Sequence, residues 1–516
     1  MRYCAIVRLV IFGSSSLISL TACAEFVSRS ELNNAVSVIS RADLKSHVDA
    51  LADDTFEGRA AGTRGGRAAA GYLRKHLASL GLEGAGRDGT FAQPFRNGCQ
   101  NLLAIIPGND PALRDEYIVI GAHYDHVGYG SRSNSYGPTG YIHNGADDNA
   151  SGTAALLELA EAFTVQPSRR SILIAFWDAE EKGLWGSKHF ISNPTIPLEN
   201  IKLALNMDMV GRLRNNQLTI YGTRTWENAR SILASVNTNM VMAKPMEINF
   251  DWEIKPNSDH HPFYLQKIPY FMPHTGLHDD YHRPRDDAHK INSAGIEAVA
   301  RFTFQTVMLL DELDQMPAFR DSSKRETPFA KRRFEKPLKA PEKRLGVRWA
   351  SEENSSGGLT VTGTDYNSPA RVGGIRRGDR MISFNGILLT SDDAMRSAVF
   401  NAPSKSNITL IRRGDDTEEQ VEVVLRGKPM RLGLSWREDT ANPNTPMVSR
   451  IIPGSPAANA GLTIADRIHA VNGQQWESSE ARHPFQGVEF PITIMYERNG
   501  SLDEVILTEG GQSRQN

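Results

Sequence analysis

Acidic residues crowd the segment "FWDAEEKG" at 176–183, where the apolar run "SILIAFW" ends. Asp178, Glu180 and Glu181 place three carboxylates within four positions, at the end of a strand that its apolar composition predicts to be buried. Carboxylates this close repel one another, and a nearby cation relieves that repulsion. The residue types therefore indicate a site for positive charge at this strand end.

Ionisable residues also follow the other apolar runs of the region. "EYIVIGAH" ends on His123, "IKLALNMD" ends on Asp208, and "IPYFMPHT" leads into "GLHDDYHRPRDD" with His282. The segment "HNGADDNASG" adds Asp147 and Asp148 just before a predicted helix. Because the carboxyl ends of the strands in an open α/β sheet share one edge, these side chains are expected to meet there. Mixed imidazole and carboxylate ligands suit Zn²⁺ best, so the pattern predicts a zinc site.

The elements that would position these residues extend from about residue 40 to 314, where helical patterns alternate with short apolar runs. Helical spacing is present in "LKSHVDALA", "GGRAAAGYLRKHLASLGL" and "SGTAALLELAEAF". Strands are predicted at "NLLAIIPG", "EYIVIGAH", "SILIAFW", "IKLALNMD" and "IPYFMPHT". This alternation predicts an α/β fold, a mostly parallel sheet with helices on both faces.

Six ordered blocks of this region carry a family resemblance. "GAHYDHVG", "GADDNASG", "WDAEEKGLWGS", "NMDMVG", "SDHHPF" and "YHRPRDD" resemble the signature blocks of the co-catalytic di-zinc aminopeptidases, a family that also holds glutamate carboxypeptidases and glutaminyl cyclases. "LADDTFEGRAAGTRGG" is similar to the start of its bacterial members. The resemblance covers about residues 40–312 and implies a zinc exopeptidase fold with two Zn²⁺ ions.

The resemblance also implies roles for single residues. Asp147 would bridge both ions, and Glu180 would be the general base. The remaining ligands would be His123 and Asp208 for one ion, and Glu181 and His282 for the other. The adjacent glutamates fit this chemistry, because one can bind a metal while its neighbour accepts a proton from the water between the ions.

Further residues are expected just outside the ligands. Asp125 and Asp286 are placed to orient the imidazoles of His123 and His282. Asp148 is expected next to the ligands, and by resemblance the peptide between Asp147 and Asp148 is expected to be cis. His126, His260 and His261 are expected to line the pocket without binding metal, and the Gly-rich residues 129–145 are expected to form a loop over the site.

Length and charge set limits on the rest of the chain. At 516 residues it should hold about three or four domains. With 58 basic and 60 acidic residues, its net charge is only −2. A net charge this small produces no strong electrostatic field that would favour nucleic acid as a partner. Function must therefore lie in local sites.

The first 23 residues contain Arg2 and Arg8, followed by an apolar stretch that is shorter than a typical membrane-spanning helix. We therefore interpret this segment as an export signal. The end of this segment, Leu20 to Cys23, is similar to a bacterial lipobox, in which the cysteine is lipidated. An ordinary signal peptide cut nearby is the alternative. A lipoprotein sorted to the periplasmic side of the outer membrane, held only by its lipid anchor, is the expectation.

The tail contains an internal repeat at an offset of 87 residues. The segment "RLGVRW" at 344–349 is repeated as "RLGLSW" at 431–436. The segment "SPARVGGIRRGDRMISFNG" at 368–386 is repeated as "SPAANAGLTIADRIHAVNG" at 455–473. Both copies resemble PDZ domains, which are small and rich in β-structure. Their carboxylate-binding loops would be Leu345, Gly346 and Val347 in the first copy, and Leu432, Gly433 and Leu434 in the second.

The expected domains are a signal peptide at 1–23, a peptidase domain at 24–314, a linker at 315–340, and PDZ-like domains at 341–428 and 429–510. The linker is basic and contains prolines, so it is expected to be extended and to leave the tail mobile. A chain truncated after Leu313 is therefore expected to keep its hydrolysis of small substrates.

Taken together, these features predict an exported metalloprotease, a hydrolase that removes N-terminal residues from peptides. The PDZ-like domains are expected to recruit peptide or protein substrates through C-terminal peptides. A carboxypeptidase or dipeptidase of the same family is one alternative. The other is an envelope scaffold with an inactive peptidase domain, but the sequence retains every predicted ligand and the base.

Overall fold

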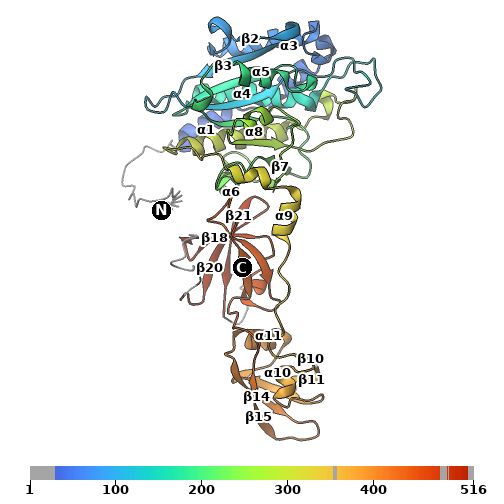
Figure 1. Cartoon of the computed structure of the whole chain (residues 1–516), viewed down its shortest axis with the longest axis vertical. Helices are drawn as coiled ribbons and strands as arrows, with labels where there is room; N and C mark the ends of the chain where they lie inside the picture. The colour runs from blue at the N-terminus through green and yellow to red at the C-terminus, as the bar shows by residue number, and fades with distance from the viewer. Residues whose placement is uncertain (1–28, 352–356, 477–484, 486, 510–516) are drawn as a thin grey trace.

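The structure is a computed structural model that describes residues 29–351, 357–476, 485 and 487–509. It has three parts arranged along one long axis (Figure 1). The N-terminal α/β domain lies at one end, the second PDZ-like domain lies next to it, and the first PDZ-like domain lies at the far end. The spatial order of the two small domains is thus the reverse of their order in the sequence.

The α/β domain is built on a nine-stranded sheet with the order β1-β3-β5-β4-β6-β9-β7-β8, and β2 pairs with β3. Its central neighbours β5, β4, β6 and β9 are parallel, whereas β3 runs antiparallel to β5 and β7 runs antiparallel to β9. The strands are β1 Glu83–Gly84, β2 Ala92–Pro94, β3 Gln100–Ile106, β4 Tyr117–His123, β5 Ser171–Trp177, β6 Ile201–Asn206, β7 Gln217–Tyr221, β8 Glu247–Phe250 and β9 Tyr270–His274.

All five strands predicted in this region are present, but the sheet is mixed. The expectation of mostly parallel pairing holds for the centre and fails at the edges. "NLLAIIPG" is as apolar as its neighbours because it is buried on both faces, and this composition does not reveal strand direction. The antiparallel strand β3 was therefore indistinguishable from a parallel one by composition.

Alternating side chains of the central strands feed two separate cores. On β5, Ile172, Ile174 and Phe176 pack into the larger core under α1, α2, α3, α4, α6 and α8, while Leu173 and Trp177 face the smaller core under α5 and α7. The helices are α1 Arg29–Val38, α2 Arg41–Leu51, α3 Arg64–Ser79, α4 Gly152–Val165, α5 Trp185–Ser192, α6 Ala229–Thr238, α7 His260–Leu265 and α8 Ser293–Asp311.

Each PDZ-like domain has a six-stranded antiparallel sheet, and the two share one topology. The first contains β10 Val347–Ser351, β11 Leu359–Thr364, α10 Pro369–Val372, β12 Arg380–Phe384, β13 Ile387–Leu388, α11 Asp392–Asn401, β14 Lys405–Ile411 and β15 Glu418–Val424. The second contains β16 Leu434–Arg437, β17 Met447–Ile451, α12 Pro456–Asn459, β18 Arg467–Val471, β19 Gln474–Gln475, β20 Ile492–Arg498 and β21 Ser501–Leu507. The sequence repeat therefore corresponds to a structural repeat.

The predicted extended linker is wrong in one respect, because it contains the helix α9, Pro328–Glu335. Thr327 caps this helix by accepting a hydrogen bond from the N–H of Ala330 at 3.2 Å, and Pro328 occupies its first turn. A Thr-Pro pair is a typical helix start, so the signal was present in the sequence. After α9, the Leu338 N–H donates to the Ser449 carbonyl at 2.8 Å, which ties the linker to the second PDZ-like domain.

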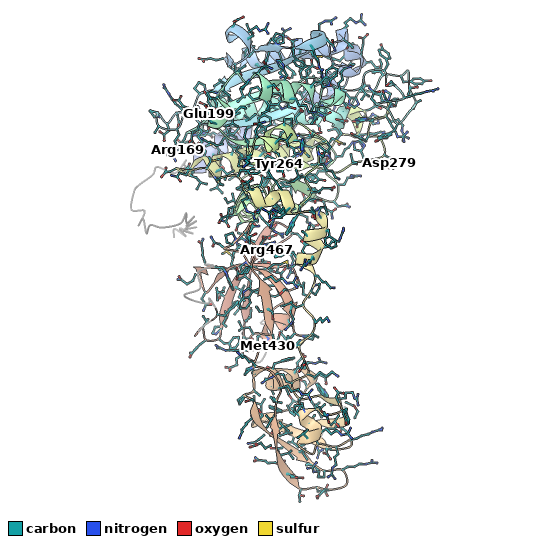
Figure 2. The ribbon with its side chains drawn as sticks, viewed as in Figure 1. Arg169, Glu199, Tyr264, Asp279, Met430 and Arg467 are labelled. Atoms are coloured by element: carbon teal, nitrogen blue, oxygen red, sulfur yellow. The ribbon has the colours of Figure 1, made fainter. Side chains whose placement is uncertain are left out.

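The second PDZ-like domain is docked on the α/β domain, contrary to the expected mobility. Arg224 lies between Asp439 of the tail at 2.6 Å and Glu326 of the linker at 2.8 Å. The Ile248 N–H on the edge strand β8 donates to the Asn499 carbonyl at 2.7 Å. Figure 2 shows Arg467 on the side of this domain nearest the α/β domain, and Met430 at the opposite end.

Among the described residues, no helix is both long enough and apolar enough to cross a membrane. Cys23 and the predicted signal at 1–23 lie outside the described residues.

Candidate metal centre

The predicted ionisable residues do meet at one edge of the sheet. His123 is the last residue of β4, and Asp208 comes two residues after β6. Glu180 and Glu181 lie in the turn after β5, and His282 lies in the segment that follows β9. The parallel centre of the sheet brings these strand ends together, as the α/β fold requires.

One group of possible ligand atoms contains His123, Asp148 and Asp208. The Nε2 atom of His123 lies 3.3 Å from Oδ1 of Asp148 and 3.6 Å from Oδ1 of Asp208. All three side chains are buried or nearly so. This group contains His123 and Asp208, both predicted for one ion. Its shared aspartate is Asp148 instead of the predicted Asp147.

The second group contains Asp148, Glu181 and His282, and also His126. The Nε2 atom of His282 lies 3.0 Å from Oδ2 of Asp148 and 3.2 Å from Oε1 of Glu181. Asp148 thus presents one carboxylate oxygen to each group. His126 was predicted to line the pocket without binding metal, yet its ring lies among the ligand atoms.

The position predicted for the bridging carboxylate is wrong by one residue, because Asp148 and not Asp147 lies between the two groups. Asp147 faces the other side of the turn, where its Oδ1 accepts the Gly211 N–H at 2.6 Å and its Oδ2 lies 3.1 Å from Nε2 of His278. The cis peptide likewise joins Asp148 and Asn149 and not Asp147 and Asp148.

Asp286 also differs from its predicted role. Its Oδ2 accepts the N–H groups of Asp147 at 2.8 Å and Asp148 at 3.1 Å, and its Oδ1 pairs with Arg212 at 2.9 Å. It therefore fixes the backbone of the turn that carries Asp148. The ring of His282 instead places its Nδ1 at 3.0 Å from the Asn134 carbonyl.

Asp125 lies beside His123, with 3.8 Å between its Oδ1 and the Nδ1 of the ring. The same oxygen accepts the Glu180 N–H at 2.9 Å. Asp125 thus links the imidazole of one group to the backbone that positions Glu180. The carboxylate accepts the Glu180 N–H, and the backbone carbonyl of Asp125 lies within hydrogen-bond distance of the His123 ring, at 3.2 Å from Nδ1.

The Glu180 side chain is half-buried and belongs to neither ligand group. Burial raises the pKa of its carboxyl well above the usual range; the charge of His123 opposes this shift, and the charge of Glu181 reinforces it. An unligated carboxyl beside a cluster of possible ligands is the arrangement that a general base needs.

No pattern in the sequence pointed to Arg59, a buried cation in "FEGRAAG". Its guanidinium donates to the carbonyls of Leu51 at 2.6 Å, Tyr124 at 2.9 Å and Gly145 at 2.9 Å. Burial lowers its pKa to about 10, and the charges of Asp148 and other acidic residues oppose the shift. Arg59 therefore stays charged at neutral pH and supplies part of the positive charge that the acidic cluster requires.

The loop at 129–145 lies against the site, as predicted. The Tyr136 N–H donates to the His282 carbonyl at 3.1 Å, and the Tyr136 ring lies 5.9 Å from the His282 ring. The Ser135 hydroxyl lies 2.7 Å from Nε2 of His143, which closes the base of the loop. The loop therefore borders His282.

Several buried atoms of the site have no hydrogen-bond partner among the described residues. They include Oδ2 of Asp125, Oδ2 of Asp148, Oε1 of Glu181 and both ring nitrogens of His126. Buried polar groups are rarely left unpaired unless a ligand occupies the space between them. Imidazole nitrogens and carboxylate oxygens suit Zn²⁺, so the residues fit the metal that the sequence predicts.

The predicted PDZ loops are built alike. Gly346 and Gly433 both have positive φ angles, 70° and 72°. In each copy an added Cβ would overlap the side chain of the serine that caps the next helix, Ser368 or Ser455. Only glycine fits there, so the two loops keep one conformation. The other loop residues are Leu345 and Val347 in the first copy, and Leu432 and Leu434 in the second.

Comparison with known proteins assigns both regions. Residues 101–307 match the model of peptidase family M28, and residues 420–486 match the model of the PDZ domain. The PDZ match lies mainly in the second copy. The chain is thus similar to peptidase family M28 over residues 101–307 and to the PDZ domain over residues 420–486.

Similar proteins include peptidases from bacteria and fungi. Leupeptin-inactivating enzyme 1 of Streptomyces exfoliatus is 30% identical over 238 residues, which are 45% of this chain and 48% of that protein. Leucine aminopeptidase 1 of Trichophyton rubrum is 31% identical over 158 residues, 29% of this chain and 40% of that protein. The chain therefore spans about half or less of the length of these curated relatives.

Among solved structures, the LapA aminopeptidase of Legionella pneumophila is similar to 55% of this chain. The match covers 76% of the LapA chain, with 21% identity and a TM-score of 0.45.

Proposed function

We propose that this chain is a zinc metallopeptidase that acts as an aminopeptidase on peptides or proteins. The observation that carries the proposal is the position of Asp148, whose two carboxylate oxygens face separate groups of buried ligand atoms. Glu180 lies beside these groups and belongs to neither. This arrangement suits two Zn²⁺ ions that share one carboxylate.

The side chains divide the work of hydrolysis. Zn²⁺ bound at the two groups would lower the pKa of a water and polarise the scissile carbonyl. Glu180 accepts the proton of the attacking water and returns it to the leaving amine. Asp125 positions the Glu180 backbone through its carboxylate at 2.9 Å, and it positions the His123 ring through its backbone carbonyl at 3.2 Å. Asp286 and Arg59 hold the turn that carries Asp148.

The charges around the site favour a free amino end over a free carboxylate. Three basic residues close to His282 are already engaged: Arg212 pairs with Asp286 at 2.9 Å, Lys290 pairs with Asp280 at 2.9 Å, and Arg283 donates to the Gly137 carbonyl at 3.2 Å. The name leucine aminopeptidase among the relatives supports the same choice.

The test is a panel of aminoacyl chromogenic substrates with free and with blocked amino groups, assayed on the full chain in the presence of Zn²⁺. Cleavage of free substrates alone is the expected result. Cleavage of substrates with blocked amino groups and a free carboxylate would favour the carboxypeptidase alternative. No cleavage by zinc-loaded, folded protein would favour the scaffold alternative.

The PDZ-like domains are proposed to recruit substrates or partner proteins by their C-terminal carboxylates. The matching loop glycines, Gly346 and Gly433, support this role, because PDZ domains hold a terminal carboxylate on backbone N–H groups. Binding of one end of a polypeptide would raise the local concentration of the other end at the metal site.

The chain is also proposed to be exported and anchored through Cys23 to the periplasmic side of the outer membrane. The lipobox-like segment from Leu20 to Cys23 supports this proposal. In Cys23→Ser the lipid should be absent from the mature protein, as mass spectrometry of the N-terminus can show. An unmodified N-terminus at another residue in the unsubstituted protein would contradict the anchor.

A further inference from the structure

His126 was not expected among the metal ligands, yet its ring is buried within them. Its Nδ1 lies 2.9 Å from Oε1 of Glu181 and 3.6 Å from Oδ2 of Asp148. Only about 1% of the residue is exposed. Neither ring nitrogen has a hydrogen-bond partner among the described residues, and the same holds for the two facing carboxylate oxygens.

Packing prevents the His126 ring from turning away. Gly145 lies so close to the ring that an added Cβ would come within 2.5 Å of its Cγ. The His126 N–H donates to the Arg59 carbonyl at 3.3 Å, which fixes the backbone. The edge of the ring also meets the His282 ring, with 5.5 Å between the centroids and an angle of 84°. The Nδ1 atom is therefore held toward Glu181 and Asp148.

The spacing of the four ligand atoms matches one tetrahedral ion. Ligand atoms that lie about 2.0–2.1 Å from a common zinc centre are about 3.3 Å apart along the edges of a tetrahedron. The four distances that involve His126 and His282 are 2.9, 3.6, 3.0 and 3.2 Å. An ion at the centre of these atoms also accounts for the lack of a hydrogen-bond partner at Nδ1 of His126 and at Oε1 of Glu181 among the described residues.

We propose that His126 is a fourth protein ligand of the ion held by Asp148, Glu181 and His282. This inference rests on the proposed function, since it deepens the account of the same metal site. The ion at this group then has a closed set of four protein ligands. The neighbouring ion has three, from His123, Asp148 and Asp208, and keeps an open position. Closed zinc sites retain the metal, and open ones receive water or substrate.

The first test measures zinc affinity and stoichiometry of the metal-stripped full chain by competition with a chromogenic chelator. The unsubstituted chain should bind one ion tightly and a second more weakly. In His126→Asn, the affinity for the tightly bound zinc ion should fall about tenfold or more. Removal of a group that only supports a metal ligand already lowers metal affinity by about 10–100-fold. His123→Asn should lower the affinity for the weakly bound zinc ion and leave the affinity for the tightly bound ion unchanged.

The control is His189→Asn, since His189 is a half-buried histidine of α5 whose ring stacks on Phe95 with 5.1 Å between the centroids, and it belongs to neither ligand group. Its zinc affinities should equal those of the unsubstituted chain. Near-ultraviolet circular dichroism checks that each variant is folded. Two equal affinities in the unsubstituted chain, or unchanged affinities in His126→Asn, would overturn the proposal.

A second variant reports on direct contact even if His126→Asn is unstable. Because Nδ1 faces the ion, a cysteine at this position has nearly the same reach, so His126→Cys loaded with Co²⁺ should show a sulfur-to-cobalt charge-transfer band. The unsubstituted chain has the buried Cys99 and should show none. Absence of the band in the folded, cobalt-loaded variant would overturn the proposal. If the ligand results hold but the unsubstituted chain cleaves no peptide, only the proposed function fails.

Discussion

Asp147 and Asp148 show how far residue types alone can define the site. The motif "GADDNASG" places two identical side chains next to each other, and either could bridge two ions. The choice is made by the backbone of the turn at 146–151, where Asp148 departs from helical geometry with φ −107° and ψ 92°. This turn sends Asp147 toward Gly211 and Asp148 toward the histidines. The ligand types were predictable, but this direction was not.

Asp148→Asn should remove zinc from both groups, because the amide offers only one oxygen where the carboxylate offers two. The expected result is less than one ion per chain and loss of peptidase activity, measured by elemental analysis and by a chromogenic assay. The matched control is Asp279→Asn, an exposed aspartate in the segment between β9 and His282, which should leave both values unchanged. Full zinc occupancy in Asp148→Asn would contradict the bridging role.

Glu180→Gln should keep the fold and the zinc content while kcat falls by about 10²–10⁴-fold, the usual effect of losing a general base. The glutamine has nearly the same shape but cannot accept the proton. Zinc content and kcat are measured on the same preparation. A turnover near that of the unsubstituted chain would remove Glu180 from the mechanism.

At the scale of elements, the sequence predicted which strands exist more reliably than how they are held together. Apolar runs located β3, β4, β5, β6 and β9, because burial on both faces of a sheet demands such composition. The contacts of Arg59 could not be predicted in the same way. Its guanidinium joins the end of α2 to the loops after β4 and before Asp148, and these contacts are distant in sequence.

Arg59→Lys should destabilise the domain, because an ammonium cannot reach the carbonyls of Leu51, Tyr124 and Gly145 together. A hydrogen bond to a charged group contributes about 1.5–3 kcal/mol, so the loss of one or two of them should be measurable. The expected result is a lower midpoint of thermal unfolding. Arg64→Lys, an exposed site on α3 whose side chain is 81% exposed, is the control and should change the midpoint little. Equal midpoints for both variants would contradict the role assigned to Arg59.

At the scale of the whole molecule, the repeat was visible in the sequence but the docking of its second copy was not. Burial raises the pKa of Asp439, but the charges of Arg467 and Arg224 outweigh burial and hold that pKa well below its usual range. This carboxylate is 1% exposed, so the tail forms part of the packed structure. Docking depends on single charged residues that are far apart in sequence, and no local pattern marks them.

Truncation after Leu313 is therefore expected to destabilise the peptidase domain, in contrast to the expectation from the sequence. It would leave Arg224 without Asp439 and Glu326, and it would expose the edge strand β8. The measurement is the unfolding midpoint of the truncated chain. An unchanged midpoint would show that the tail is not needed for stability.

Removal of the first PDZ-like domain alone is the control for this truncation. The Arg426 N–H donates to the Arg344 carbonyl at 3.0 Å, so a chain with residues 345–425 deleted can be joined at these two positions. Because this domain lies at the far end of the molecule, its removal should preserve stability and the cleavage of small substrates (Figure 1).

Zinc dependence of peptide cleavage is the most direct test of the central claim. The full chain is stripped with a chelator, its zinc content is measured, and hydrolysis of a substrate with a free amino group is followed while Zn²⁺ is added back. The stripped chain should be inactive, and the rate should rise with zinc and level off at about two ions per chain, as for a two-metal site. Undiminished hydrolysis by a folded chain without detectable metal would contradict the account.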